Sequence, residues 1–167
     1  MFQTVDLARV AVTEFRRGLE GLSAEESSIR VSKADGTTMN AIAWSVQHIA
    51  RHWWNAKQAA TGATAASVPP ASSDGTPPAW QDALAHFDVA TSDLAWIDVT
   101  NDEQFLAIPA FSQRESTGTF LGRAIFHTWF HIGEINAVRQ MLGHDEIMFV
   151  GPAGAELTWI PAGKDGR

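Results

Sequence analysis

The sequence contains no cysteine among its 167 residues. Disulfide bonds, thiolate-bound zinc and a cysteine nucleophile are therefore excluded, so any sulfur chemistry must use a thiol from outside the chain. The sequence also lacks a run of roughly 18 apolar residues, the length that spans a bilayer. Its amino terminus shows no basic region followed by an apolar core and a small-residue cleavage site. We therefore expect a cytoplasmic protein that does not enter a membrane.

Positive charge is scarce, because 12 Lys and Arg residues face 19 Asp and Glu residues and give a formal net charge of -7. A nucleic-acid-binding protein usually carries a basic footprint, so neither DNA nor RNA is an expected partner. The chain is 45% hydrophobic and 19% charged. This composition and length predict one domain with a buried core.

Period-2 alternation is almost absent, whereas apolar residues recur at spacings of three and four, which predicts an all-α fold. Four segments carry this pattern, at about 4–21, 39–60, 77–99 and 117–142. We therefore predict a four-helix bundle. The apolar stripes of the first two segments are Ala8, Val12, Phe15, Leu19 and Leu22, and Ile42, Val46, Ile49, Trp53, Ala56 and Ala60.

The connections between these segments are long. Residues 61–79 are rich in Gly, Ala, Ser, Thr and Pro, and residues 101–117 are predicted to form another loop. Such connections permit a bundle with crossovers. We assign residues 1–143 to the bundle and expect residues 144–167 to form an irregular tail that packs on the same domain.

Local signatures predict several helix ends. Ser23 and Glu26 have the spacing of a capping box, which predicts a short helical turn after the first long helix. Thr117 or Thr119 is the predicted cap at the start of the fourth long helix. Gly143 is placed to end that helix.

Three histidines on two predicted helices form a candidate metal site. His127 and His131 are four residues apart, so both side chains lie on one helical face and could present a ring nitrogen to the same ion. The second predicted helix would supply His48, which lies in a row with Ser45 and His52 that could line a cavity. The alternative is a cluster of hydrogen-bonded histidines without a metal.

Two further groups share these helical faces. His52 follows His48 by four residues and could be a fourth ligand, a proton shuttle or a partner of a ligand, or a histidine satisfied at the surface. Glu134 follows His131 by three residues and is a candidate catalytic residue. It could hold a histidine tautomer or a metal-bound water, or form a simple salt bridge.

Arg51, Arg123 and Arg139 are candidates for binding a cofactor, because guanidinium groups attract the carboxylates of a thiol cofactor or an acidic substrate. Their alternative role is to form ion pairs. Tryptophans cluster around both histidine motifs, where indoles can shape an apolar pocket or pack in the core. They are Trp44, Trp53, Trp54 and Trp129.

Two segments carry a resemblance to a known family: NAIAWSVQHIAR at residues 40–51 and HTWFHIGEI at residues 127–135, with Arg139 and Gly143 following. With these motifs in this helical order, residues 1–143 resemble the DinB-like superfamily. Its members include thiol-dependent transferases and the metal-binding domain of mycothiol-dependent maleylpyruvate isomerase. The resemblance implies that His48, His127 and His131 are the metal ligands and that the chain forms a homodimer. The family pattern usually has no histidine at position 52.

Three neutral imidazoles leave coordination positions open for water or substrate, as in catalytic zinc sites. We expect zinc or nickel, although imidazole also suits copper and iron, so ligand type does not choose the metal. A metal-bound thiol would ionise near neutral pH, and the thiolate is the nucleophilic form of sulfur. The resemblance thus predicts a thiol transferase or thiol-dependent isomerase. Its partners would be a low-molecular-weight thiol, such as mycothiol or bacillithiol, and a small electrophile.

Two other functions remain open. In metal-assisted hydrolysis, the same ion would lower the pKa of bound water instead of a thiol. In a non-catalytic stress-response protein, the bundle would bind a metal or a small ligand without turnover. A diiron oxidase is less favoured, because ferritin-like sites need several carboxylates and Glu-x-x-His pairs on facing helices.

Overall fold

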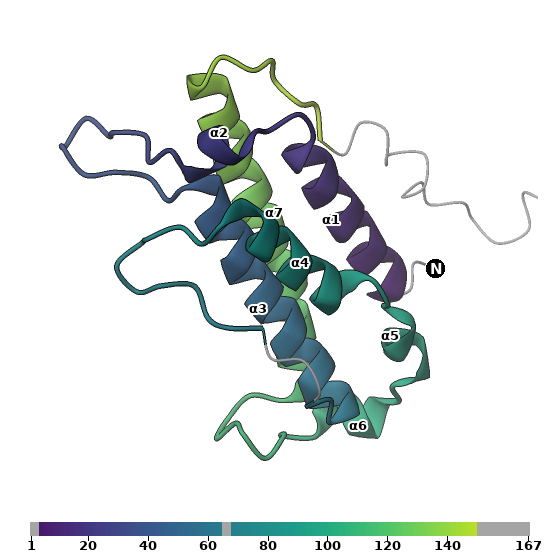
Figure 1. Cartoon of the computed structure of the whole chain (residues 1–167). Helices are drawn as coiled ribbons and strands as arrows, with labels where there is room; N and C mark the ends of the chain where they lie inside the picture. The colour runs from purple at the N-terminus through teal and green to yellow at the C-terminus, as the bar shows by residue number, and fades with distance from the viewer. Residues whose placement is uncertain (1–3, 65–67, 150–167) are drawn as a thin grey trace, which may run out of the picture.

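The computed structural model describes residues 4–64 and 68–149, and every regular element in this part of the chain is a helix (Figure 1). The predicted all-α class is confirmed. The helices are α1 (Thr4–Leu19), α2 (Ala24–Ser28), α3 (Ile42–Thr61), α4 (Trp80–Thr91), α5 (Ala95–Val99), α6 (Asp102–Leu106) and α7 (Thr117–Met141).

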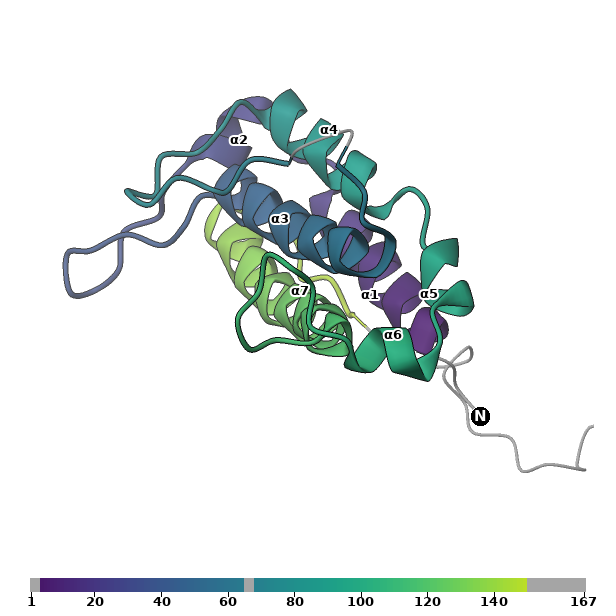
Figure 2. The ribbon, with the colours of Figure 1, turned by 90° about the horizontal axis from the view of Figure 1, so that it is seen from below.

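The four longest helices, α1, α3, α4 and α7, pack around a common core. Helix α3 contacts both α4 and α7, and α7 also contacts α1. Figure 2 shows this arrangement, with α3 between α4 and α7. The central position of α3 explains why half of its residues are buried, and it brings α3 and α7 side by side along much of their length.

The stripes predicted for α1 and α3 form the centre of the core. Phe15 and Trp53 are both fully buried, and the Phe15 ring lies 4.9 Å from the ring of Phe87 on α4. Leu22 and Ala60, at the ends of the two stripes, are only partly buried. Apolar side chains at helical spacing thus determine which faces of these helices pack together.

The third predicted helix, 77–99, is shorter than expected, and this prediction was wrong at both ends. The helix begins only at Trp80 and stops at Thr91, and a separate helix, α5, follows. Between the two helices, a carboxylate oxygen of Asp93 accepts a hydrogen bond from the backbone N–H of Ala95, at 2.9 Å. Such a local bond competes with continuation of the helix.

The predicted loop at 101–117 contains helix α6, which the sequence reading missed. Asn101 and Gln104 cap its start reciprocally, each side chain bonding to the backbone N–H of the other residue. At the start of α7 the cap is Ser116, not Thr117 or Thr119, because the Ser116 hydroxyl accepts from the N–H of Thr119 at 3.2 Å.

Two other predicted helix ends are confirmed. Ser23 and Glu26 form the capping box of α2. Gly143 follows α7 with a φ of 95°, a left-handed conformation that favours glycine and ends the helix.

The start of the predicted tail contacts the bundle. The side chain of Asn136 on α7 accepts a hydrogen bond from the N–H of Ile147 at 3.1 Å. Arg17 on α1 donates to the carbonyl of Met148 at 2.6 Å. Residues 150–167, the rest of the predicted tail, lie outside the described residues.

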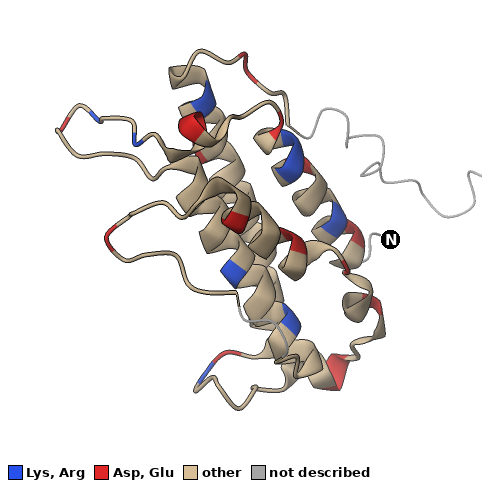
Figure 3. Ribbon diagram, in the orientation of Figure 1, with Lys and Arg blue, Asp and Glu red and all other residues tan. Residues whose placement is uncertain are grey.

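Acidic and basic residues are interspersed over the helices and loops that Figure 3 colours, without a continuous basic band in that view. None of the helices in the described ranges combines the length and the apolar character needed to cross a bilayer.

Candidate metal centre

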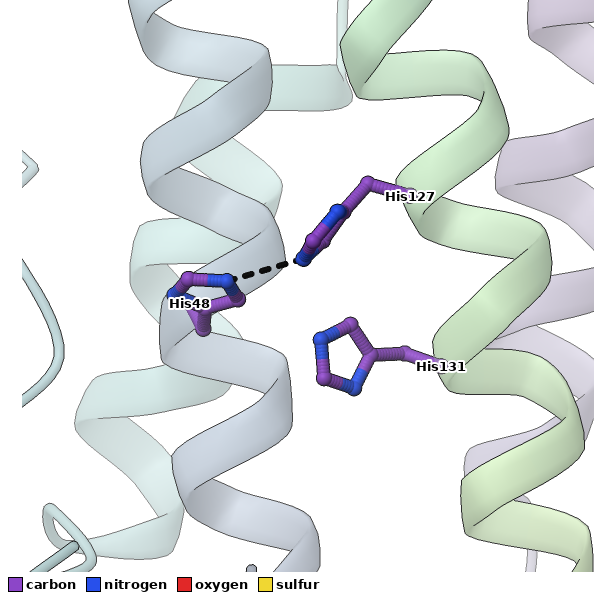
Figure 4. A group of neighbouring side chains, drawn as sticks. All are labelled: His48, His127 and His131. Carbon is purple, nitrogen blue, oxygen red and sulfur yellow. Dashed lines mark hydrogen bonds between the residues drawn. The ribbon is translucent and has the colours of Figure 1, made fainter.

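Helices α3 and α7 run antiparallel and carry the candidate ligands on facing sides. The direction follows from their contacts: Ser45, near the start of α3, bonds to Glu134 late in α7, whereas Ala59 near the end of α3 accepts from Thr117 at the start of α7. This pairing sets His48 of α3 opposite His127 and His131 of α7. Figure 4 shows the three rings pointing into the space between the two helices.

The three histidines bring their ring nitrogens close together. The Nε2 atoms of His48 and His127 lie 2.9 Å apart. One nitrogen from each of these two residues and one from His131 all lie within 4.8 Å of one another. Two nitrogens bound at about 2.1 Å to one tetrahedral ion lie about 3.4 Å apart, so the closest pair would move apart slightly and wider pairs would move closer. The spacing and the ligand type fit a divalent metal.

Glu134 orients one of the rings. Its carboxylate lies 2.6 Å from Nδ1 of His131 and accepts the hydroxyl of Ser45 at 3.0 Å and the amide of Asn40 at 3.4 Å. When Nδ1 of His131 carries the proton and donates to this carboxylate, the lone pair of Nε2 is free for an ion. A carboxylate that fixes the tautomer of a ligand in this way is common in metal sites.

Glu134 is suited to this orienting role because it remains charged. Burial alone would raise the pKa of its carboxyl group. The hydrogen bonds from His131, Ser45 and Asn40, with the charge of His131, outweigh burial and hold that pKa below its ordinary value. All three donors approach the carboxylate, so the structure places Glu134 as a partner of a candidate ligand. Its predicted catalytic role is not tested by this geometry.

Burial also disfavours the protonated forms of two of the candidate ligands, His48 and His127. Burial, together with the nearby charges of His131 and His127, lowers the pKa of His48 to about 4. The pKa of His127 is lowered mainly by burial as well. Metal ions bind the neutral imidazole, so at neutral pH protons compete weakly for these nitrogens.

His52 lies at the edge of this cluster. Its Nε2 is 3.3 Å from Nε2 of His48, and its ring centre is 4.5 Å from that of His127. Burial, together with the charges of His48 and His127, lowers the pKa of His52 to about 3. His52 is not among the three residues whose nitrogens lie within 4.8 Å of one another. Its role as an additional ligand stays a prediction.

The candidate arginines lie in different places. Arg51, three residues after His48, donates one N–H to the carbonyl of Val68 at 2.6 Å and also lines a pocket. Arg123, four residues before His127, pairs with Glu115. Its charge contributes to lowering the pKa of His127. Arg51 and Arg123 are therefore close to the histidines.

Arg139 instead anchors α7 to α1. Its Nη1 donates to the carbonyls of Gly18 and Glu20, at 3.2 and 2.8 Å. It lies eight residues after His131, about 12 Å along the helix. These bonds satisfy carbonyls at the carboxyl end of α1, so the structure separates Arg139 from the histidine centre and gives its guanidinium a structural role.

The predicted tryptophan cluster divides between site and core. The Trp44 ring stacks on His48, with centres 4.8 Å apart and an interplanar angle of 16°. Its indole N–H donates to the carbonyl of Ser72 at 2.8 Å, which holds the ring in place. Trp53 and Trp54 are buried in the core, and Trp129 is partly buried against it.

Asn40 is the site residue that the sequence reading left without a role. It precedes α3 and reaches Glu134 from outside the helix, so helical spacing could not reveal it. The other two histidines of the sequence lie elsewhere: His86 bonds to Gln47, and His144 bonds to Glu26.

The helical arrangement and the histidine cluster agree with a comparison to known families. The family model of the DinB superfamily matches residues 8–135, which include the candidate ligands and Glu134. The chain belongs to the DinB superfamily. No curated protein and no solved structure is significantly similar to it. The function of this DinB superfamily protein is therefore inferred from the geometry of its site.

Proposed function

We propose that this DinB superfamily protein is a metal-dependent thiol transferase. The convergence of His48, His127 and His131 within 4.8 Å carries the proposal, because three neutral imidazoles on two rigid helices suit a divalent ion with open positions. Zinc or nickel is the proposed metal. When bound, the ion would lower the pKa of a low-molecular-weight thiol such as mycothiol or bacillithiol.

The chain's own residues hold the centre in shape. Glu134 fixes the tautomer of His131, and Trp44 stacks on His48 and restricts rotation of its ring. In the reaction, the thiol loses its proton to solvent and its sulfur forms a bond to an electrophilic carbon. A leaving group departs with its electron pair, or, at an activated double bond, the neighbouring carbon takes up a proton.

Metal content is the first test. Untagged protein purified without added metal should contain about one zinc or nickel per chain by elemental analysis. His48→Ala, His127→Ala and His131→Ala should each lose this metal while circular dichroism still reports the helical fold. His144→Ala is the matched control, because His144 bonds to Glu26 outside the cluster. Wild-type protein that contains no metal and binds no added zinc or nickel would overturn the proposal.

Thiol dependence is the second test, and it separates transfer from hydrolysis. Metal-loaded protein should consume an alkylating electrophile only when a low-molecular-weight thiol is present. Cleavage of an ester substrate without any thiol would instead support the hydrolase, in which the same ion activates water. Metal binding without thiol transfer and without ester hydrolysis would support a non-catalytic binding protein.

We also propose that the chain is a homodimer that pairs through the exposed face of α7 that carries Phe126 and Phe130. Phe126 and Phe130 are 77% and 65% exposed on this face, an unusual position for two large apolar rings. The Phe130 ring lies 5.1 Å from that of His131, so a second copy would cover the apolar surface beside the candidate centre. The family resemblance supports a dimer, and this face supplies a surface for it.

Sedimentation analysis tests the dimer. Wild-type protein should sediment as a dimer, and Phe126→Ser should shift it towards monomer. Leu106→Ser is the matched control, because Leu106 is also 77% exposed but lies on α6. A monomeric wild type, or an equal effect of the two substitutions, would overturn this pairing.

A further inference from the structure

A pocket of about 490 Å³ lies at the seam between α3 and α7. Arg51 and Asn55 line this open pocket from α3, Phe120 lines it from α7, and residues 111–115 line it from the loop before α7. Its volume falls within the range of pockets that bind small molecules. Neither the metal ligands nor Glu134 line it, so it is a second cavity beside the candidate metal centre.

The pocket opens on the same side of the seam as the histidines. Asn55 follows His48 by seven residues, and Phe120 precedes His127 by seven. Seven residues make almost two helical turns, so each pair shares one face of its helix. Because α3 and α7 run antiparallel, both offsets point in the same direction along the seam. The pocket therefore lies about 10 Å from the histidine pair along the helix axes.

The pocket offers hydrogen-bond donors and positive charge. Arg51 uses one N–H on the carbonyl of Val68, which leaves other guanidinium donors available. Within the described part of the chain, the guanidinium of Arg114 and the amide of Asn55 have no hydrogen-bonding partner. The acidic residue of the lining, Glu115, is paired with Arg123. In a chain with a net charge of -7, this excess of donors favours an anion.

The lining also has an apolar part. The rings of Phe111 and Phe120 lie 5.4 Å apart and are tilted by 55°. Phe111 is 51% exposed, so its ring is accessible to a ligand. A suitable ligand therefore combines a carboxylate with an apolar or planar segment.

We propose that this pocket binds the carboxylate end of a small molecule that reacts at the histidine centre. This inference rests on the proposed function, because it assigns the pocket to the carboxylate-bearing thiol or to a carboxylate-bearing electrophile. Arg51 and Arg114 bind the carboxylate, and Asn55 donates to a neighbouring polar group. A molecule of tripeptide length spans about 10 Å when extended, so one end reaches the histidines while the other occupies the pocket.

Isothermal titration calorimetry with zinc-loaded protein distinguishes the two sources of the carboxylate, the thiol and the electrophile. The thiol arm compares glutathione, a tripeptide thiol with two carboxylates, with its diethyl ester, in which neither carboxylate carries a charge. The electrophile arm compares 6-maleimidohexanoate, whose activated double bond and carboxylate lie at opposite ends of an extended molecule, with its methyl ester. Arg51→Met and Arg114→Met should each lower the affinity for the carboxylate form by about tenfold or more in at least one arm. The affinity for the ester should stay unchanged. Arg30→Met, a substitution of an exposed arginine outside the pocket, should change neither.

The outcomes separate this inference from the proposed function. If thiol transfer occurs but both arginine variants bind every ligand as the wild type does, the pocket assignment is overturned and the function stands. If the variants lose carboxylate affinity but no thiol transfer occurs, the pocket assignment stands and the function fails. Arg114 lies on an exposed loop, so its variant keeps the test valid even if Arg51→Met unfolds.

Discussion

The two sides of the seam between α3 and α7 are built from the same helices but differ in chemistry. On the inner side, Ile49 and Trp53 of α3 are fully buried, and Ile132 of α7 is only 3% exposed. On the outer side, His48 and His127 are only partly buried and face each other at 2.9 Å. The inner side resembles any helix interface, whereas the outer side holds several imidazoles in a small space.

This difference shows which side stabilises the fold and which side is available for function. Burial of apolar side chains stabilises the inner side. On the outer side, burial lowers the pKa of His48 to about 4 and that of His52 to about 3, so the surroundings disfavour the protonated rings. A cluster of this kind adds little to stability by itself. It becomes stabilising when an ion binds the neutral nitrogens.

Trp53→Ala, on the inner side, should have the largest effect. It removes a fully buried indole whose N–H donates to the Thr128 hydroxyl at 3.0 Å. Loss of such a side chain lowers the free energy of unfolding by about 3–5 kcal/mol. Urea denaturation of the metal-free protein measures this loss. Trp53→Phe retains most of the ring and should cost clearly less. If the two substitutions are equally mild, the inner side is not the stabilising one.

His127→Ala, on the outer side, should leave the metal-free protein almost as stable as wild type, because the ring is partly exposed and its surface is polar. The difference in stability between this variant and the wild type should appear when zinc is bound. A ligand present at 1,000 times its dissociation constant stabilises a protein by about 4 kcal/mol, and the variant should lose most of this gain. Thermal unfolding with and without zinc measures both values. A large loss of stability without metal would contradict the comparison.

The inner side could be predicted from the sequence because apolar periodicity determines it. Phe15 and Trp53 lie in the predicted stripes and are fully buried. The break after Thr91 could not be predicted, because it depends on local bonds such as the one between Asp93 and Ala95. The cap at Ser116 depends on the same kind of local geometry.

The candidate ligands could also be named from the sequence, because a spacing of four residues places His127 and His131 on one helical face. Their convergence with His48 depends on the register between two helices that are distant in sequence. The partners of Glu134 come from α3 and from Asn40 before it, and Arg139 turns to the end of α1. Side chains of one helix can serve different neighbours, and spacing alone does not distinguish them.

Glu134→Gln sharpens the comparison on the outer side and should have a moderate effect. The carboxylate that accepts from Nδ1 of His131 is replaced by a neutral amide. Loss of such a partner typically weakens metal binding by about 10- to 100-fold. Competition with a chelator of known zinc affinity measures the change. Glu25→Gln makes the same change of charge on exposed α2 and should have no effect. Unchanged zinc affinity in Glu134→Gln would mean that the carboxylate does not support the ligand.

The smallest expected effect is a pH dependence of the metal-free protein that comes from the outer side. In the folded protein the pKa of His52 is lowered from 6.5 to about 3. As pH falls below about 6.5, the unfolded chain therefore takes up protons that the folded chain does not, and stability is lost progressively. His52 is partly exposed, which moderates the size of this loss.

His52→Gln removes this proton uptake, so the urea midpoint should fall less steeply between pH 7 and pH 5 in the variant than in wild type. This pH range lies above the pKa of most carboxyl groups, so the change of stability within it comes mainly from histidines. His144→Gln changes a histidine outside the cluster and serves as the control. If the wild type and His52→Gln show the same slope, burial of His52 does not disfavour its protonated form. His52 would then take up protons as a solvated surface histidine does, and any metal bound by it would have to compete with those protons.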